Sequence, residues 1–170
     1  MNTVFYISSA VAIAATCMVI TRRSAVHALL YLILSLLSIA LVFFTLGAPF
    51  VAALEVIIYA GAIMVLFVFV IMMLNLGRQA AEQERRLYSP AGWIGPAILA
   101  GILLAEVVYI LARGSGNAAE AVEIGPHAVG LSLFGPYLLG VELAALILLA
   151  GLVGAYHLGR HPQTPDEKGT

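Results

Sequence analysis

Three glutamates lie inside long apolar stretches of this 170-residue chain, where an ionisable side chain needs an explanation. Glu55 lies near the start of the apolar run over 51–77, and Tyr59 follows four residues later on the same face of a helix. A carboxylate in hydrocarbon is costly and by default marks a functional site. We interpret Glu55 and Tyr59 as elements of a proton path, in which the hydroxyl hydrogen-bonds the carboxyl or orders a water. The alternative is a neutral, hydrogen-bonded acid that serves packing only.

The other two acids, Glu142 and Glu106, lie in the last two apolar stretches. Glu142 lies about two turns into its stretch, on the side of the membrane predicted for Glu55, so the two carboxyls could approach each other across a helix interface. A functional and a purely structural role for Glu142 both stay open. Glu106 lies close to Tyr109 and Arg113, where pairing or snorkelling to the interface accounts for it. We therefore leave Glu106 outside the predicted site.

Gly61 is the second notable feature of the third stretch, because glycine weakens a helix relative to alanine. One interpretation is packing, since small residues let membrane helices approach closely. The other is a π-bulge, an irregularity found frequently at functional sites. One inserted residue turns everything beyond it by about 100°, so forming or losing a bulge would switch the lining of a water path. Periodicity alone does not decide between the two.

The elements that position these residues are five apolar segments, each about long enough to cross a bilayer. The chain is 62% hydrophobic and 10% charged, with a mean hydropathy of +1.05, whereas a soluble domain carries roughly 25% charged residues. We predict an all-α integral membrane protein, with a single five-helix domain over 1–158 and a polar tail over 159–170. The predicted helices cover about 4–20, 25–46, 51–76, 93–112 and 135–158.

Glycine and proline bound several of these segments. The sequence Gly47-Ala48-Pro49 predicts a tight turn between the second and third helices. The fourth helix is predicted to start at Trp93, with Pro96 in its first turn. Residues 113–131 are predicted to form an exposed loop. The end of this connection, 128–134, is apolar enough to lie on the membrane surface or on a partner.

Positive charges are segregated along the chain. With five spans, one side of the membrane receives seven of the eight lysines and arginines, and the other side receives only Arg113. Because lysine and arginine mark the cytoplasmic side, we predict a periplasmic N-terminus and a cytoplasmic C-terminus in a bacterial inner membrane. The seven residues are Arg22, Arg23, Arg78, Arg85, Arg86, Arg160 and Lys168.

Composition and spacing argue against several function classes. The single cysteine, Cys17, excludes an intrachain disulfide and disfavours a cysteine metal site. The four histidines do not converge on one side of the membrane at metal-ligating spacing. The sequence has no glycine-rich phosphate loop, no nucleophile–base constellation and no basic patch for nucleic acid. The chain is therefore predicted to be a membrane component of a larger assembly, with lipid and protein neighbours.

Specific sequence runs resemble a known family. They are HALLYLILSLLSIALVFFTLGAPFVAALEVIIYAGAIMVLFVFVIMMLNLG, GWIGPAIL and LFGPYLLGVELAALILLAGLVGAYHLGR. These runs closely resemble the subunit J family of NADH-quinone oxidoreductase, respiratory complex I, and YAGAIMVLFVFVIMMLN is the most characteristic part. The connection after Arg113 and the tail after Arg160 are the divergent parts.

The resemblance implies a five-helix component of the membrane arm, near the junction with the quinone-binding region. Such a component belongs to a proton-translocating enzyme but has no catalytic centre, flavin, iron–sulfur cluster or tightly bound quinone of its own. FMN, iron–sulfur clusters and quinone are expected in other components of the complex. The expected partners are the small K component, the quinone-site H component, the A component, the antiporter-like subunits and the lipid bilayer.

The resemblance also implies a π-bulge in the third helix, matched here by the stretch from Tyr59 to Phe67. Interconversion of bulged and regular forms is linked in the family to a water path between the quinone cavity and the acid-bearing helices of neighbouring subunits. Glu55, Tyr59 and Glu142 match the family pattern and form the expected coupling set. The expected gate comprises Ala60, Gly61, Ala62, Met64, Val65, Leu66 and Phe67.

Two other interpretations stay open at this point. The chain could be a small membrane component of a related cation/proton antiporter or membrane-bound hydrogenase. Alternatively, it could be a passive scaffold that only holds its neighbours together.

Overall fold

A computed structural model describes residues 2–22, 24–73, 90–113 and 124–159, and these residues form helices joined by turns, without any strand. Five helical stretches in these ranges are long and apolar enough to cross a membrane. The all-α, five-span prediction is thereby confirmed, while the orientation of the termini stays a prediction. The five stretches are Thr3–Thr21, Ala25–Thr45, Pro49–Met73, Gly92–Ala112 and Leu138–Gly159.

The chain divides into two units, Met1–Pro126 and His127–Thr170, each described by itself. The first unit holds α1 (Asn2–Thr21), α2 (Ala25–Thr45), a third span in three pieces, and α6 (Pro90–Arg113). The pieces of the third span are α3 (Pro49–Leu54), the π-helical η1 (Glu55–Ile63) and α4 (Met64–Met73). The short α7 (Pro126–Leu133) begins at the unit boundary, and the second unit continues into α8 (Leu138–Gly159).

Helix α6 starts earlier than predicted. Pro90 occupies its first turn, where the missing N–H costs nothing, so the helix begins at Pro90 and not at about Trp93. The predicted membrane span of about 93–112 agrees with the observed Gly92–Ala112. Pro96 is instead buried in the helix interior. There its ring removes the backbone hydrogen bond that would otherwise reach the carbonyl of Gly92.

The fifth predicted helix starts later than expected. Residues 134–137 form a turn, in which the Tyr137 N–H donates to the Ser132 carbonyl at 3.1 Å, and α8 begins only at Leu138. The apolar residues before this turn, predicted to end an exposed loop, are helical as α7. Proline at the first position of α7 supports that start.

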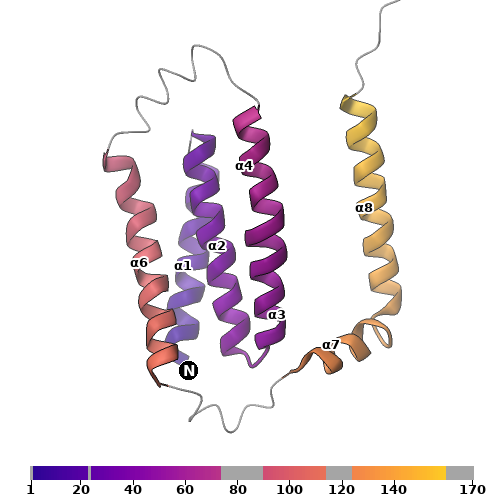
Figure 1. The fold of residues 1–170 in the computed structure, drawn as a ribbon, viewed down its shortest axis with the longest axis horizontal. Helices are drawn as coiled ribbons and strands as arrows, with labels where there is room; N and C mark the ends of the chain where they lie inside the picture. The colour runs from indigo at the N-terminus through magenta and orange to yellow at the C-terminus, as the bar shows by residue number, and fades with distance from the viewer. Residues whose placement is uncertain (1, 23, 74–89, 114–123, 160–170) are drawn as a thin grey trace, which may run out of the picture. The chain divides into compact units, whose positions relative to one another are not determined.

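Helix α2 organises the first unit, because it contacts α1, the third span and α6 (Figure 1). Small polar side chains join α1 to α2: Thr16 Oγ1 and Ser35 Oγ lie 2.8 Å apart. Such interhelical hydrogen bonds satisfy polar groups that lipid cannot. The apolar core of the unit comprises Val11, Ala15, Leu34 and Leu103, flanked by Leu37, Leu41, Leu99 and Ile102.

Helices α2 and α6 approach closely at two glycines. A Cβ on Gly92 would lie 2.7 Å from His27 Nε2, and a Cβ on Gly95 would overlap the Tyr31 hydroxyl. The glycines are three residues apart on α6 and their partners are four residues apart on α2, so each pair shares one helix face. Glycine at these positions is required by the contact between the helices.

The turn between α2 and α3 is the tight turn that the sequence predicts. Gly47 has φ 82°, in the left-handed region, and its N–H donates to the Phe44 carbonyl at 3.1 Å. The Gly47 carbonyl in turn accepts from the Ile124 N–H at 2.9 Å. The turn thus sets the antiparallel course of α2 and the third span, and it also holds the chain before α7.

We expect Gly47→Ala to destabilise the protein by about 1–2 kcal/mol, because a residue with a Cβ is strained in the left-handed region. The measurement is the thermal unfolding midpoint of the purified assembly. Gly101→Ala is the matched control, since a Cβ at Gly101 meets nothing within 4 Å. Equal midpoints for the two variants would contradict the expectation.

Candidate functional site

The third span changes helix type along its length. Between α3 and α4, the nine residues Glu55–Ile63 are π-helical. At the end of this segment the Met64 N–H donates to the carbonyl of Tyr59, five residues earlier, as a π-helix requires. The predicted π-bulge in the third helix is confirmed. It starts at Glu55, four residues before the expected Tyr59–Phe67 stretch, so Val65 and its successors lie in regular α-helix.

Local sequence favours this interruption. Val56, Ile57 and Ile58 are β-branched, and such side chains lose rotamer freedom against the preceding helical turn. Gly61 avoids a close contact: a Cβ there would lie 3.2 Å from the Val56 carbonyl oxygen, closer than most Cβ contacts in proteins. In the wide π-helical turn, the carbonyl of Val56, five residues earlier, lies against Gly61. Of the two interpretations of Gly61, the irregular helix thus has direct structural support.

Glu55 and Tyr59 both lie in the π segment. Glu55 is its first residue and is half-buried, whereas Tyr59 is 49% exposed. The described residues show no hydrogen bond between the Glu55 carboxyl and the Tyr59 hydroxyl. The direct bond considered from the sequence is therefore not formed, and the other possibility, a hydroxyl that orders a water, stays a prediction.

The expected gate residues divide between two elements. Ala60, Gly61 and Ala62 lie in η1, while the other four lie in α4. Met64 is fully buried, at 1% exposed, whereas Val65, Leu66 and Phe67 are 50–65% exposed. These three side chains lie on the surface of this chain, so any constriction that they form has to be completed by a neighbour or by lipid.

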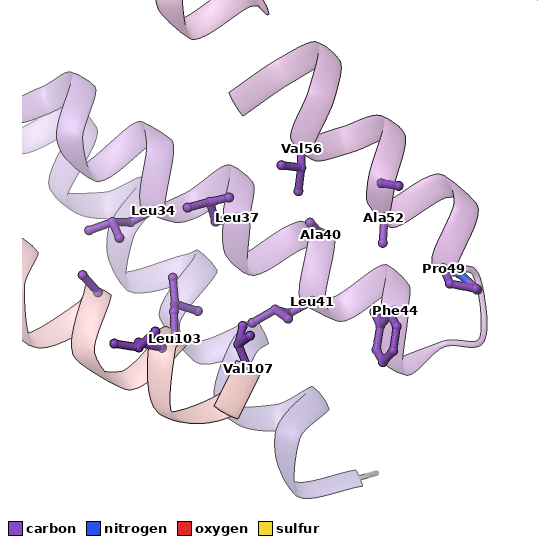
Figure 2. Close-up of a pocket in the computed structure, with 13 residues that line it drawn as sticks. Leu34, Leu37, Ala40, Leu41, Phe44, Pro49, Ala52, Val56, Leu103 and Val107 are labelled. Carbon is purple, nitrogen blue, oxygen red and sulfur yellow. The ribbon is translucent and has the colours of Figure 1, made fainter. Parts of the chain in front are cut away.

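An apolar pocket of about 580 Å³ borders the π segment on the side that faces α2 and α6. Figure 2 shows Val56 of η1 and Ala52 of α3 facing Leu37 and Ala40 of α2 across it. All its lining side chains are apolar. The remaining lining residues are Leu34, Leu41, Phe44, Pro49, Ala53, Ala100, Leu103, Leu104 and Val107. On this side, the π segment contributes Val56 to an apolar lining, and neither Glu55 nor Tyr59 is among the lining residues.

Comparison with known proteins then decides the family. A model of the family described as NADH-ubiquinone/plastoquinone oxidoreductase chain 6 matches residues 15–158. The chain belongs to this family. It is similar to NADH-quinone oxidoreductase subunit J of Pseudomonas aeruginosa, at 58% identity over 161 residues, which is 94% of this chain and 97% of that protein. The resemblance to subunit J is confirmed.

Two further relatives agree. Subunit J of Escherichia coli K12 is 58% identical over 166 residues, covering 98% of this chain and 90% of that protein. Subunit J of Buchnera aphidicola subsp. Acyrthosiphon pisum is 47% identical over 168 residues, covering 99% of each. The likeness thus includes all five spans and both sides of the π segment.

Glu142 belongs to the second unit of the chain. It lies in the second turn of α8 and is exposed. Glu55 and Glu142 belong to different units of the chain, so the approach of Glu142 to Glu55 stays a prediction.

The surroundings of Glu106 were not predicted from the sequence. It is 6% exposed, and its Oε2 accepts a hydrogen bond of 2.8 Å from Ser8 Oγ of α1. Of the two explanations from the sequence, snorkelling to the interface is therefore wrong. Pairing with Arg113, whose side chain lies outside the described residues, stays a prediction. Glu106 is buried because of its helix face: Leu99, Leu103 and Glu106 follow the i, i+4, i+7 pattern that packs inward. The matching signal on α1 is Ser8, which lies between the buried Val4 and Val11 at the same spacing.

Proposed function

We propose that this chain is a non-redox membrane-arm component of proton-translocating NADH:quinone oxidoreductase, which couples quinone reduction to proton pumping. The observation that carries the proposal is the π segment Glu55–Ile63, in a member of the chain 6 family, with an acid at its first position. Helix irregularities of this kind occur frequently at functional sites because they hold two alternative hydrogen-bond registers.

In the proposed mechanism the third span changes register. Loss of the π-bulge turns the chain beyond it by about 100°, so Val65, Leu66 and Phe67 change the face that they present to their neighbours. Glu55 precedes the bulge and keeps its position with α3. The acid thus stays in place while apolar side chains move toward or away from it. Hydrophobic constrictions that wet and dry are an established gating device, and Tyr59 supplies a hydroxyl at the edge of such a path.

The proposal assigns no redox centre to this chain, with FMN, iron–sulfur clusters and quinone in other components of the complex. The partners proposed are the K, H and A components, the antiporter-like subunits and the bacterial inner-membrane lipid. Many large apolar side chains of α4 and α8 are exposed in the isolated chain, which supports extensive contacts with protein and lipid. The segregation of positive charge supports a periplasmic N-terminus.

One measurement separates this proposal from a role in an antiporter or hydrogenase. The assembly that contains this chain is purified and assayed for NADH-dependent quinone reduction and for flavin absorbance. We expect both, and an assembly that lacks both would exclude the proposed enzyme.

We expect Glu55→Gln to slow quinone-coupled proton pumping by roughly tenfold, below the hundredfold typical of a positioned proton-transfer group because Tyr59 remains. The measurement is proton uptake by reconstituted vesicles at a matched content of this chain. Glu55→Asp retains the carboxyl and is expected to pump at close to the original rate. A passive scaffold predicts equal pumping in all three proteins, and that result would contradict the proposal.

A further inference from the structure

The pair formed by Glu106 and Ser8 lies apart from the π segment, at the contact of α6 with α1. Ser8 is 0% exposed, and its hydroxyl donates to Glu106 Oε2 at 2.8 Å. The second carboxyl oxygen, Oε1, is also buried, and no group among the described residues hydrogen-bonds to it. Because this chain itself covers Oε1, a neighbouring protein cannot reach that oxygen without moving α1 or α6.

Among the side chains that the structure describes, the helices packed around Glu106 offer no nearby cation. In the described parts of α1, α2 and the turn between them, the basic side chains are Arg22 and His27, which lie at the other end of the unit. Arg22 is 14 residues from Ser8, about 21 Å along a helix axis. On α6 itself, Tyr109 lies one turn from Glu106. Arg113 follows seven residues after Glu106, at the end of α6, and its side chain lies outside the described part of the structure.

The other titratable side chains on these helices do not supply a positive charge. They are Tyr6 and Cys17 of α1 and Tyr31 of α2, of which Tyr31 already packs against Arg22. An ionised Glu106 would thus be a buried charge without a counter-ion among the described side chains, which costs several kcal/mol or more. A neutral acid leaves at most one hydrogen-bonding group without a partner, at a cost of about 1–3 kcal/mol. The neutral form is the lower in free energy.

We propose that Glu106 is a proton-binding site inside the membrane span, occupied by a proton in the resting protein. The proton resides on Oε1, and Oε2 is the carbonyl oxygen that accepts from the Ser8 hydroxyl. Ser8 is a positioning residue, since it fixes the carboxyl between α1 and α6. The inference rests on the geometry of these two residues and does not depend on the proposed function.

Infrared spectroscopy of the whole purified assembly at neutral pH tests this assignment. The spectrum of the wild type minus that of Glu106→Gln is expected to contain the carbonyl band of a protonated carboxylic acid. Glutamine keeps an oxygen that accepts from Ser8 and differs little in size, so the packing of α1 on α6 is retained. A difference spectrum that shows carboxylate bands in place of the acid band would overturn the proposal.

Ser8→Ala provides a second readout that does not require the Glu106 variant to assemble. With the Ser8 hydroxyl removed, the carbonyl of the acid loses its hydrogen bond, and its band is expected to move to higher frequency. Cys17→Ser is a control on the same helix, and it is expected to leave the band in place. An acid band that does not move in Ser8→Ala would overturn the assignment of Oε2 as the bonded carbonyl. Neither readout requires turnover, so failure of the pumping experiments leaves this test unaffected.

Discussion

Replacing Gly95 by alanine is expected to weaken the packing of α6 on α2. The new Cβ would overlap the Tyr31 hydroxyl, and Tyr31 has no room to withdraw because it is 2% exposed. Arg22 holds it further: the guanidinium lies 5.3 Å from the centre of the Tyr31 ring, and Arg22 Nη2 lies 3.5 Å from the hydroxyl. Overpacking of this kind costs about 1–3 kcal/mol. We expect the content of this chain in the purified assembly to fall by roughly tenfold, which corresponds to about 1.4 kcal/mol.

Two further variants serve as controls for Gly95→Ala. Tyr31→Phe removes the oxygen that the new methyl group would overlap, so Gly95→Ala combined with Tyr31→Phe is expected to recover most of the lost protein. Gly101→Ala, on the same helix and with nothing within 4 Å of the added Cβ, is expected to assemble normally. If Gly95→Ala assembles as well as Gly101→Ala, the close approach of the two helices is not as the structure has it.

Gly61→Ala is expected to shift the third span from the π form toward the regular α-helix. Two effects add: in the π register the Cβ would lie 3.2 Å from the Val56 carbonyl oxygen, and alanine stabilises a regular helix by about 1 kcal/mol relative to glycine. A bias of about 1 kcal/mol changes the ratio of the two forms roughly fivefold. If interconversion gates the water path, pumping is expected to fall severalfold while the content of this chain in the assembly stays normal.

The decisive measurement for Gly61→Ala is the hydrogen-bond register of the third span in the assembled enzyme, determined together with the pumping rate. Gly101→Ala again provides the control, because it gives the same gain in helix propensity in a helix without a π segment. An unchanged register with unchanged pumping would contradict the gating mechanism. Normal pumping with the π segment lost would contradict the role of the bulge in particular.

Part of the site could be predicted from the sequence. The acid Glu55, the tyrosine one turn later and the permissive Gly61 are local features, and a helix irregularity depends mainly on residues a few positions apart. The residue at which the bulge begins could not be predicted from the sequence. Whether it begins at Glu55 or at Tyr59 depends on which carbonyl each N–H selects, and neighbouring registers differ by little free energy.

The five spans, the Gly47 turn and the family could be predicted from the sequence, because long apolar runs, a glycine in a tight turn and a characteristic motif are all properties of continuous segments. The environment of Glu106, the contact of Gly95 with Tyr31 and the apolar pocket beside Val56 became known only from the folded structure. Each of these depends on which face of one helix meets which face of another. In a membrane, almost every face is apolar, so hydrophobic periodicity carries little information about that choice.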